Sequence, residues 1–139
     1  EILRKLRGRR FSGRAIQETL AVLERVCLID DVDFARRWVE ERMRLRPMGR
    51  PMLARELKRR GVAEDIAARV LDETLAEVDP ESVALELLRG RRERYRGLDR
   101  RKSLSRMYGF LARRGFGAAV SHDAAERAWG EFEDSQQQG

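Results

Sequence analysis

The chain has 139 residues, of which 42% are apolar and 39% charged, and its formal net charge at pH 7 is +6. This length predicts one ordinary domain or a short array of small units. The sequence has no apolar run near twenty residues, which excludes a usual membrane-spanning helix. Its single cysteine excludes an internal disulfide, and a cytosolic location is expected.

Apolar residues recur at helical spacing and no stretch alternates with period two, so we expect an all-α fold. Similar units of this size would stack as tandem repeats, because none could hold a core alone. The helices group as three, three and two, which predicts repeats at 1–46, 47–96 and 97–134 and a frayed tail at 135–139. The eight predicted helices are 1–9, 13–27, 31–46, 50–60, 63–77, 80–94, 99–114 and 117–133.

Capping residues mark several of these helix boundaries. Asp30 or Asp31 is expected to N-cap the third helix, Asp79 the sixth and Asp99 the seventh. Pro80, directly after Asp79, suits the first position of a helix.

The third predicted helix has one apolar face, which is expected to lie in the core. Phe34, Ala35 and Trp38 belong to this face. Cys27 precedes it on a helical pattern and is interpreted as a small hydrophobic residue, buried or half-buried. A second apolar face, in the seventh helix, includes Tyr108.

A six-residue pattern occurs three times. Gly61 is expected to be the left-handed residue after a helix, with Leu57 in the apolar contact of a Schellman cap. Leu111 and Gly115 repeat this arrangement, whereas Arg10 takes the glycine position in the first copy. The basic residues inside the pattern suit the negative end of a helix dipole, so they need no ligand to explain them. The three copies are LRGRRF (6–11), LKRRGV (57–62) and LARRGF (111–116).

Positive charge is concentrated in residues 89–102, RGRRERYRGLDRRK, which include eight basic and two acidic side chains. A local excess of this kind suggests an anionic partner, most often nucleic acid. The alternative is a solvated helical face with no ligand.

No catalytic or metal-binding constellation is visible. His122 is the only histidine and Cys27 the only cysteine, so we expect no His/Cys metal site, no catalytic triad and no cofactor. Asp30, Asp31 and Asp33 are interpreted as residues at a helix start rather than as metal ligands. The protein is therefore not expected to be an enzyme.

Residues 28–62 closely resemble the RecX family of regulatory proteins. The opening EILRKLRGRRF and the segment FLARRGF resemble two further motifs of that family, so the resemblance covers nearly the whole chain. The matching residues in the central segment are Leu28, Ile29, Asp30, Asp31, Phe34, Ala35, Trp38, Val39, Arg42, Pro47, Gly49, Leu53, Glu56, Leu57, Arg60, Gly61 and Val62.

The resemblance implies a negative regulator of the RecA recombinase, built as an elongated, curved array of three-helix units. Such a protein binds in the groove of the RecA–DNA filament and inhibits filament growth, ATP hydrolysis, strand exchange and coprotease activity. The implied partners are RecA and single- and double-stranded DNA. The chain has no heptad seam for dimerisation, so a monomer is expected, and no membrane partner is expected.

Two other functions stay open at this point. The chain could be a general DNA-binding helical-repeat protein, or a protein-only scaffold whose charges confer solubility. Whether the chain regulates RecA on DNA or binds DNA in general, its contacts to phosphates would be independent of base sequence and sensitive to salt. The candidate contact residues are Arg42, Arg50, Arg55, Lys58, Arg59, Arg89, Arg91, Arg92, Arg94, Arg96, Arg100, Arg101, Lys102, Arg113 and Arg114.

Overall fold

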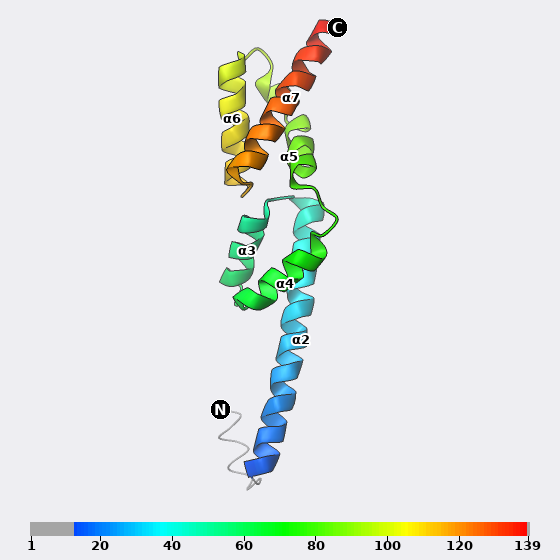
Figure 1. Cartoon of the computed structure of the whole chain (residues 1–139), viewed down its shortest axis with the longest axis vertical. Helices are drawn as coiled ribbons and strands as arrows, with labels where there is room; N and C mark the ends of the chain where they lie inside the picture. The colour runs from blue at the N-terminus through cyan, green and yellow to red at the C-terminus, as the bar shows by residue number, and fades with distance from the viewer. Residues whose placement is uncertain (1–12, 139) are drawn as a thin grey trace. The chain divides into compact units, whose positions relative to one another are not determined.

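The structure, a computed structural model, describes residues 13–138, and every regular element in that range is a helix (Figure 1). The all-α prediction is therefore confirmed for these residues. The predicted helix 1–9 and the first copy of the six-residue pattern lie outside them. The elements are α2 (Gly13–Leu45), α3 (Arg50–Arg59), α4 (Glu64–Thr74), α5 (Pro80–Arg89), the 3-10 helix η1 (Arg92–Tyr95), α6 (Arg100–Arg113) and α7 (Ala118–Gln138).

The chain divides into two compact units, residues 1–34 and 35–139. The boundary falls within α2, at the point where the apolar side chains become buried. This division differs from the three expected repeats, and the repeat arrangement stays a prediction.

In the first unit, α2 continues through the point where the sequence predicted a break. Asp30 and Asp31 lie inside this helix, so their predicted role as N-caps is wrong. The physical reason is that residues 14–46 contain neither glycine nor proline, and two aspartates alone cost a helix only a few tenths of a kcal/mol each, about 0.7 at most.

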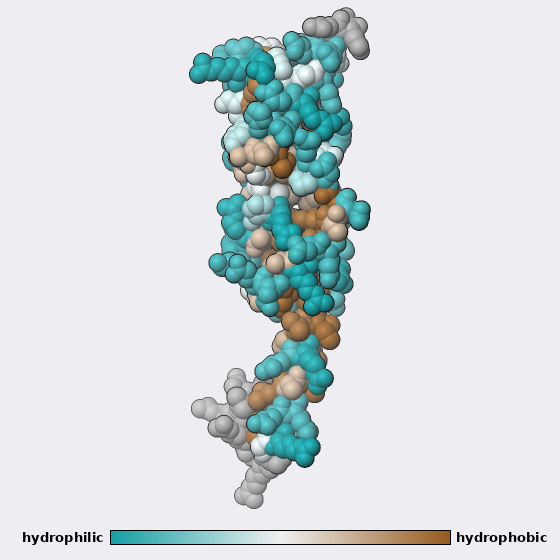
Figure 2. All heavy atoms as spheres, viewed as in Figure 1, coloured by the Kyte–Doolittle hydropathy of each residue, from teal (hydrophilic) through white to brown (hydrophobic). Residues whose placement is uncertain are grey.

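Apolar side chains of the first unit are exposed along α2, where brown spheres interrupt the hydrophilic surface in Figure 2. Cys27 is also exposed, which corrects its predicted burial. Phe34, at the end of this unit, is 41% exposed and was wrongly predicted to be core. The exposed apolar residues before it are Val22, Val26, Leu28 and Ile29.

The second unit contains the buried residues of the fold. Helices α5, α6 and α7 pack together, and their contact surfaces are fully buried. Ala35 is fully buried as predicted, whereas Trp38 is only half-buried. The apolar residues with no exposure are Ala35, Val39, Leu53 and Leu57 from α2 and α3, and Ala84, Leu88, Met107, Leu111, Ala124 and Ala128 from α5 to α7.

Both predicted glycine caps within the described residues are present. Gly61 has a φ of 87° and Gly115 a φ of 86°, the left-handed region that favours glycine. After α3, Val62 N–H donates to Leu57 O at 3.0 Å and Gly61 N–H donates to Lys58 O at 3.0 Å. These are the two hydrogen bonds of a Schellman motif, and the same pair ends α6.

The N-caps predicted before α5 and α6 are also present. The Asp79 carboxylate accepts from Glu81 N–H at 3.3 Å, and the Asp99 carboxylate accepts from Lys102 N–H at 2.8 Å. Each carboxylate lies beside the positive end of a helix dipole. The pKa of Asp79 is lowered, and the hydrogen bond from the Ser82 side chain is the largest cause.

Several helix ends differ from the prediction. Helix α5 ends at Arg89 rather than at residue 94, because Gly90 has a poor helix propensity and the chain continues into η1. Helix α4 ends at Thr74 instead of residue 77. Helix α7 runs to Gln138, five residues beyond its predicted end at residue 133.

The segment after α2 crosses the end of α6 at two glycines. Gly49 N–H donates to Arg114 O at 2.8 Å. A Cβ atom on Gly49 would lie 2.1 Å from Gly115 O, so only glycine allows this approach. The crossing fixes the residues before Gly49 beside the C-terminal end of α6.

Candidate anion-binding surface

The structure divides the fifteen basic candidates by whether a carboxylate neutralises them. Five form ion pairs, and these are unfavourable choices for contacting an outside anion because their charge is already compensated. The pairs are Arg42–Glu56 at 3.1 Å, Arg50–Asp72 at 2.6 Å, Arg89–Glu131 at 2.6 Å, Arg96–Glu93 at 3.3 Å and Arg100–Glu126 at 2.6 Å.

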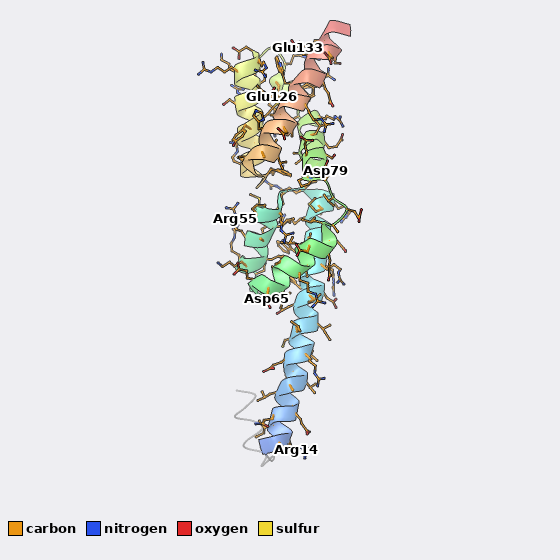
Figure 3. All side chains as sticks on the ribbon, in the orientation of Figure 1. Arg14, Arg55, Asp65, Asp79, Glu126 and Glu133 are labelled. Carbon is orange, nitrogen blue, oxygen red and sulfur yellow. The ribbon has the colours of Figure 1, made fainter. Side chains whose placement is uncertain are left out.

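The other ten candidates have no carboxylate within 4.0 Å among residues 13–138. Several are fully on the surface, such as Arg55, which Figure 3 labels on α3. They are Arg55, Lys58, Arg59, Arg91, Arg92, Arg94, Arg101, Lys102, Arg113 and Arg114.

The basic segment 89–102 does not form one uniform charged face. Arg89 belongs to a clamp between α5 and α7, donating to both carboxylate oxygens of Glu131 at 2.9 and 2.6 Å. This pairing lowers the pKa of Glu131 and raises that of Arg89. Arg91 and Arg92 instead lie over aromatic rings, which is a packing role as well as a charge.

Helix α6 provides the clearest excess of positive charge. Its fourteen residues, RRKSLSRMYGFLAR, include five basic side chains and no acidic one. Among the described residues, Arg100 is the only one of the five with a carboxylate partner, Glu126 on α7, which Figure 3 labels. The other four are exposed and have no carboxylate partner within the described range.

Three of these side chains form a row along α6. Lys102, Arg106 and Arg113 are spaced i, i+4 and i+11, which places them on one face of a helix. Gly109 occupies the remaining position of the row, so no side chain separates the charges there. With a rise of about 1.5 Å per residue, the row is about 16 Å long.

An exposed aromatic residue lies on a different side of α6 from this row, because it follows Arg106 by two residues, about 200° around the helix. Tyr108 is 40% exposed, although the sequence pattern placed it on the buried face of its helix. It follows Arg101 by seven residues and therefore lies on the same side of α6 as Arg101. We call the side chains of Arg101, Lys102, Arg106, Tyr108 and Arg113 the α6 surface.

Sequence reasoning missed Arg106 and Tyr108 as candidate contact residues. The signal for Arg106 was available, because no acidic residue occurs between Arg100 and Arg113 and the i, i+4 spacing from Lys102 is visible. The exposure of Tyr108 could not be predicted in this way, because its apolar neighbours in the sequence are compatible with Tyr108 on either the buried or the exposed face of the helix.

Arg42 has a structural role in the second unit. The Glu56 carboxylate accepts from both Trp38 Nε1 at 2.9 Å and Arg42 Nε at 3.1 Å. The guanidinium carbons of Arg42 and Arg60 lie 4.9 and 4.6 Å from the centre of a Trp38 ring. These contacts join α2 to α3 and account for Arg42 without an external ligand.

The part of the chain that the structure describes contains no group of three or more His, Cys, Asp or Glu side chains arranged to hold a metal ion. None of its helices is both long enough and apolar enough to cross a membrane.

Comparison with known proteins identifies the family. Residues 30–71 match the family described as RecX, second three-helix domain. The protein named Regulatory protein RecX from Amycolatopsis mediterranei is 31% identical over 132 residues, covering 95% of this chain and 75% of that protein. The chain belongs to the RecX family. A Chlorobium phaeobacteroides RecX protein is 38% identical over 116 residues, or 84% of this chain and 74% of that protein.

The match to other RecX proteins is less complete in length. The Streptomyces coelicolor protein is 36% identical over 124 residues, but these cover only 64% of it, so this chain spans less than two thirds of that relative. No solved structure matches the chain significantly. The RecX segment at 30–71 includes the Trp38–Glu56 contact and the Gly61 cap, whereas α6 lies outside it.

Proposed function

We propose that this RecX-family chain regulates a RecA recombinase by binding the RecA–DNA filament and inhibiting its growth. Suppression of ATP hydrolysis, strand exchange and coprotease activity would follow from the loss of filament. The protein acts in this proposal without catalysis or a cofactor, as a monomer in the cytosol. Family membership supports the regulatory role, and the α6 surface supports contact with DNA.

The observation that carries DNA contact is the absence of acid from α6. Five basic residues on fourteen positions would repel one another across a solvated helix, and only Arg100 is neutralised by a carboxylate within residues 13–138. A polyanion removes that repulsion and releases its condensed counterions on binding. A row of Lys102, Arg106 and Arg113 suits phosphates, which position a protein without reading base sequence.

Tyr108 favours single-stranded DNA over a duplex as the preferred form. Its ring is partly exposed beside Arg101. Unpaired bases stack on exposed aromatic side chains, with a contribution of about 1–3 kcal/mol per base. A duplex offers no free base face at that position, so its contacts would be limited to phosphates.

The direct test measures ATP hydrolysis by a bacterial RecA on single-stranded DNA during titration with this protein. We expect suppression at substoichiometric protein, because one bound regulator prevents addition of further RecA subunits. Suppression should weaken as salt rises, since phosphate contacts are screened. Unchanged hydrolysis at equimolar protein and low salt would refute the proposal.

The runner-up is a general DNA-binding protein with no specific effect on RecA. The same unpaired charges favour it, so DNA binding alone does not separate the two. A general DNA-binding protein would inhibit RecA only at concentrations where it covers nearly all of the single-stranded DNA. Measuring ATP hydrolysis at fixed RecA while the length of single-stranded DNA is varied separates them: filament inhibition follows the ratio to RecA, and coating follows the ratio to nucleotides.

A further inference from the structure

Three arginines from distant parts of the second unit converge near the C-terminal end of α6. Arg46 follows α2, Arg91 follows α5 and Arg114 follows α6. None of the three has a carboxylate partner within the described residues. Burial lowers the pKa of Arg114, and the nearby charges of Arg46 and Arg91 lower it further.

Two of these guanidinium groups share one aromatic support. The guanidinium carbon of Arg91 lies 3.9 Å from the centre of the Phe110 ring, and that of Arg114 lies 5.0 Å from it. They are therefore no more than 8.9 Å apart, the sum of those two distances. Arg91 Nε also donates to the Tyr95 hydroxyl at 3.3 Å, which restricts its side chain further.

The backbone holds Arg46 beside this pair. Arg114 donates from its guanidinium to Pro47 O at 3.1 Å, and Gly49 N–H donates to Arg114 O at 2.8 Å. These bonds bind the residues directly after Arg46 to the end of α6. The crossing of the two chain segments therefore places the backbone of Arg46 close to Arg114, and the exposed Arg46 side chain starts from this fixed position.

Helix dipoles account for only part of this charge. Arg46 and Arg114 each follow the C-terminal end of a helix, where the dipole is equivalent to about half a negative charge. Two such ends offset about one of the three positive charges. Arg91 follows α5 by two residues but is directed to Phe110, so roughly two charges stay uncompensated.

We propose that Arg46, Arg91 and Arg114 form a discrete binding site for one phosphate group. A phosphate oxyanion accepts several charge-assisted hydrogen bonds, and arginine presents paired donors that match it. The anion would also relieve the mutual repulsion of the three guanidinium groups. The phosphate can come from a DNA backbone or from a free nucleotide, and the site requires neither base recognition nor RecA.

The first experiment measures binding of inorganic phosphate, ADP and an oligothymidylate to the whole chain at constant ionic strength. NMR signals of the arginine Nε–H groups report which side chains respond. We expect the Arg91 and Arg114 signals to shift with at least one probe. Response to the oligonucleotide alone assigns a backbone phosphodiester, and response to ADP or phosphate assigns a free phosphate. No shift with any probe overturns the site.

Substitution of Arg46 gives the decisive comparison. The Arg46 side chain is exposed, so Arg46→Gln should leave the fold intact. It should weaken the binding affinity for the probe that shifts the arginine signals by about tenfold. Arg94→Gln removes the same charge from an exposed residue with no carboxylate partner in the described range, and should weaken binding less than twofold. Equal losses in the two variants would show diffuse attraction and overturn the site. Because these assays contain no RecA, failure of the proposed regulatory function would leave this result unaffected.

Discussion

Trp38 donates its indole N–H to the Glu56 carboxylate across 2.9 Å, which joins α2 to α3. The same Oε1 atom accepts from Arg42, so one oxygen satisfies two donors. Glu56→Ala should lower the free energy of unfolding by about 1–3 kcal/mol, because it removes the acceptor of both hydrogen bonds from half-buried donors. Urea denaturation followed by tryptophan fluorescence measures this change.

The matched control for this prediction is Glu40→Ala on α2. Glu40 is exposed and forms no ion pair with another described residue, so its removal should change stability by less than about 0.5 kcal/mol. Equal effects of the two substitutions would show that the shared hydrogen bonds do not stabilise the α2–α3 contact.

The two glycine caps should respond differently to the same substitution. Both glycines have positive φ, so alanine costs about 1–2 kcal/mol at either position. A Cβ atom on Gly61 would meet nothing within 4 Å, whereas one on Gly115 would lie 2.4 Å from Met52 Cβ. Gly115→Ala should therefore destabilise the protein by a further 1–3 kcal/mol or so. Thermal denaturation of both variants tests this order, and the reverse order would contradict the close packing at α6.

Ser103 offers a stabilising substitution. Its hydroxyl is fully buried on α6 and has no hydrogen-bond partner among the described residues. Ser103→Ala removes this unsatisfied group and should raise the free energy of unfolding by about 1 kcal/mol. The exposed Ser105→Ala serves as a control for helix propensity. A loss of stability specific to Ser103→Ala would show that the hydroxyl is satisfied.

The Arg89–Glu131 pair gives a prediction on pH. Arg89 lowers the pKa of Glu131 below its ordinary value of 4.5. The pair therefore contributes its full stability above pH 4.5, and this contribution is lost as the pH falls through the folded-state pKa. The effect is small because both side chains are well exposed.

Thermal midpoints of wild type and Glu131→Gln measured from pH 7 to pH 3 test this sign. The wild type should be more stable at neutral pH, and the two curves should converge on acidification. Glu133→Gln, at the position labelled on α7 in Figure 3, lacks the Arg89 contact and should show no such convergence. A gap between wild type and Glu131→Gln that widens in acid would contradict the lowered pKa.

Local signals made parts of the fold predictable. The caps at Gly61, Gly115, Asp79 and Asp99 depend on residues within a few positions of each helix end, so the sequence was sufficient. The break expected at Asp30 is absent because the capping propensity of aspartate competes with a helix that contains no glycine or proline from residue 14 to residue 46.

The candidate surface depended on contacts that are remote in sequence. Whether Arg89 or Arg100 is free is decided by Glu131 and Glu126 on another helix, 42 and 26 residues away. No local pattern reveals such pairing. Exposure of Tyr108 likewise depends on where α7 packs against α6, since helical periodicity alone allowed it to be buried.

The most direct test of the central claim compares two charge-neutralised variants in the RecA assay. One carries Lys102→Gln, Arg106→Gln and Arg113→Gln on α6; the other carries Arg55→Gln, Lys58→Gln and Arg59→Gln on α3, with the same change in net charge. We predict that the α6 variant needs at least about tenfold more protein to suppress ATP hydrolysis by RecA on single-stranded DNA, because three phosphate contacts are lost. The α3 variant should stay close to wild type. Full suppression by the α6 variant at the wild-type concentration would contradict the account.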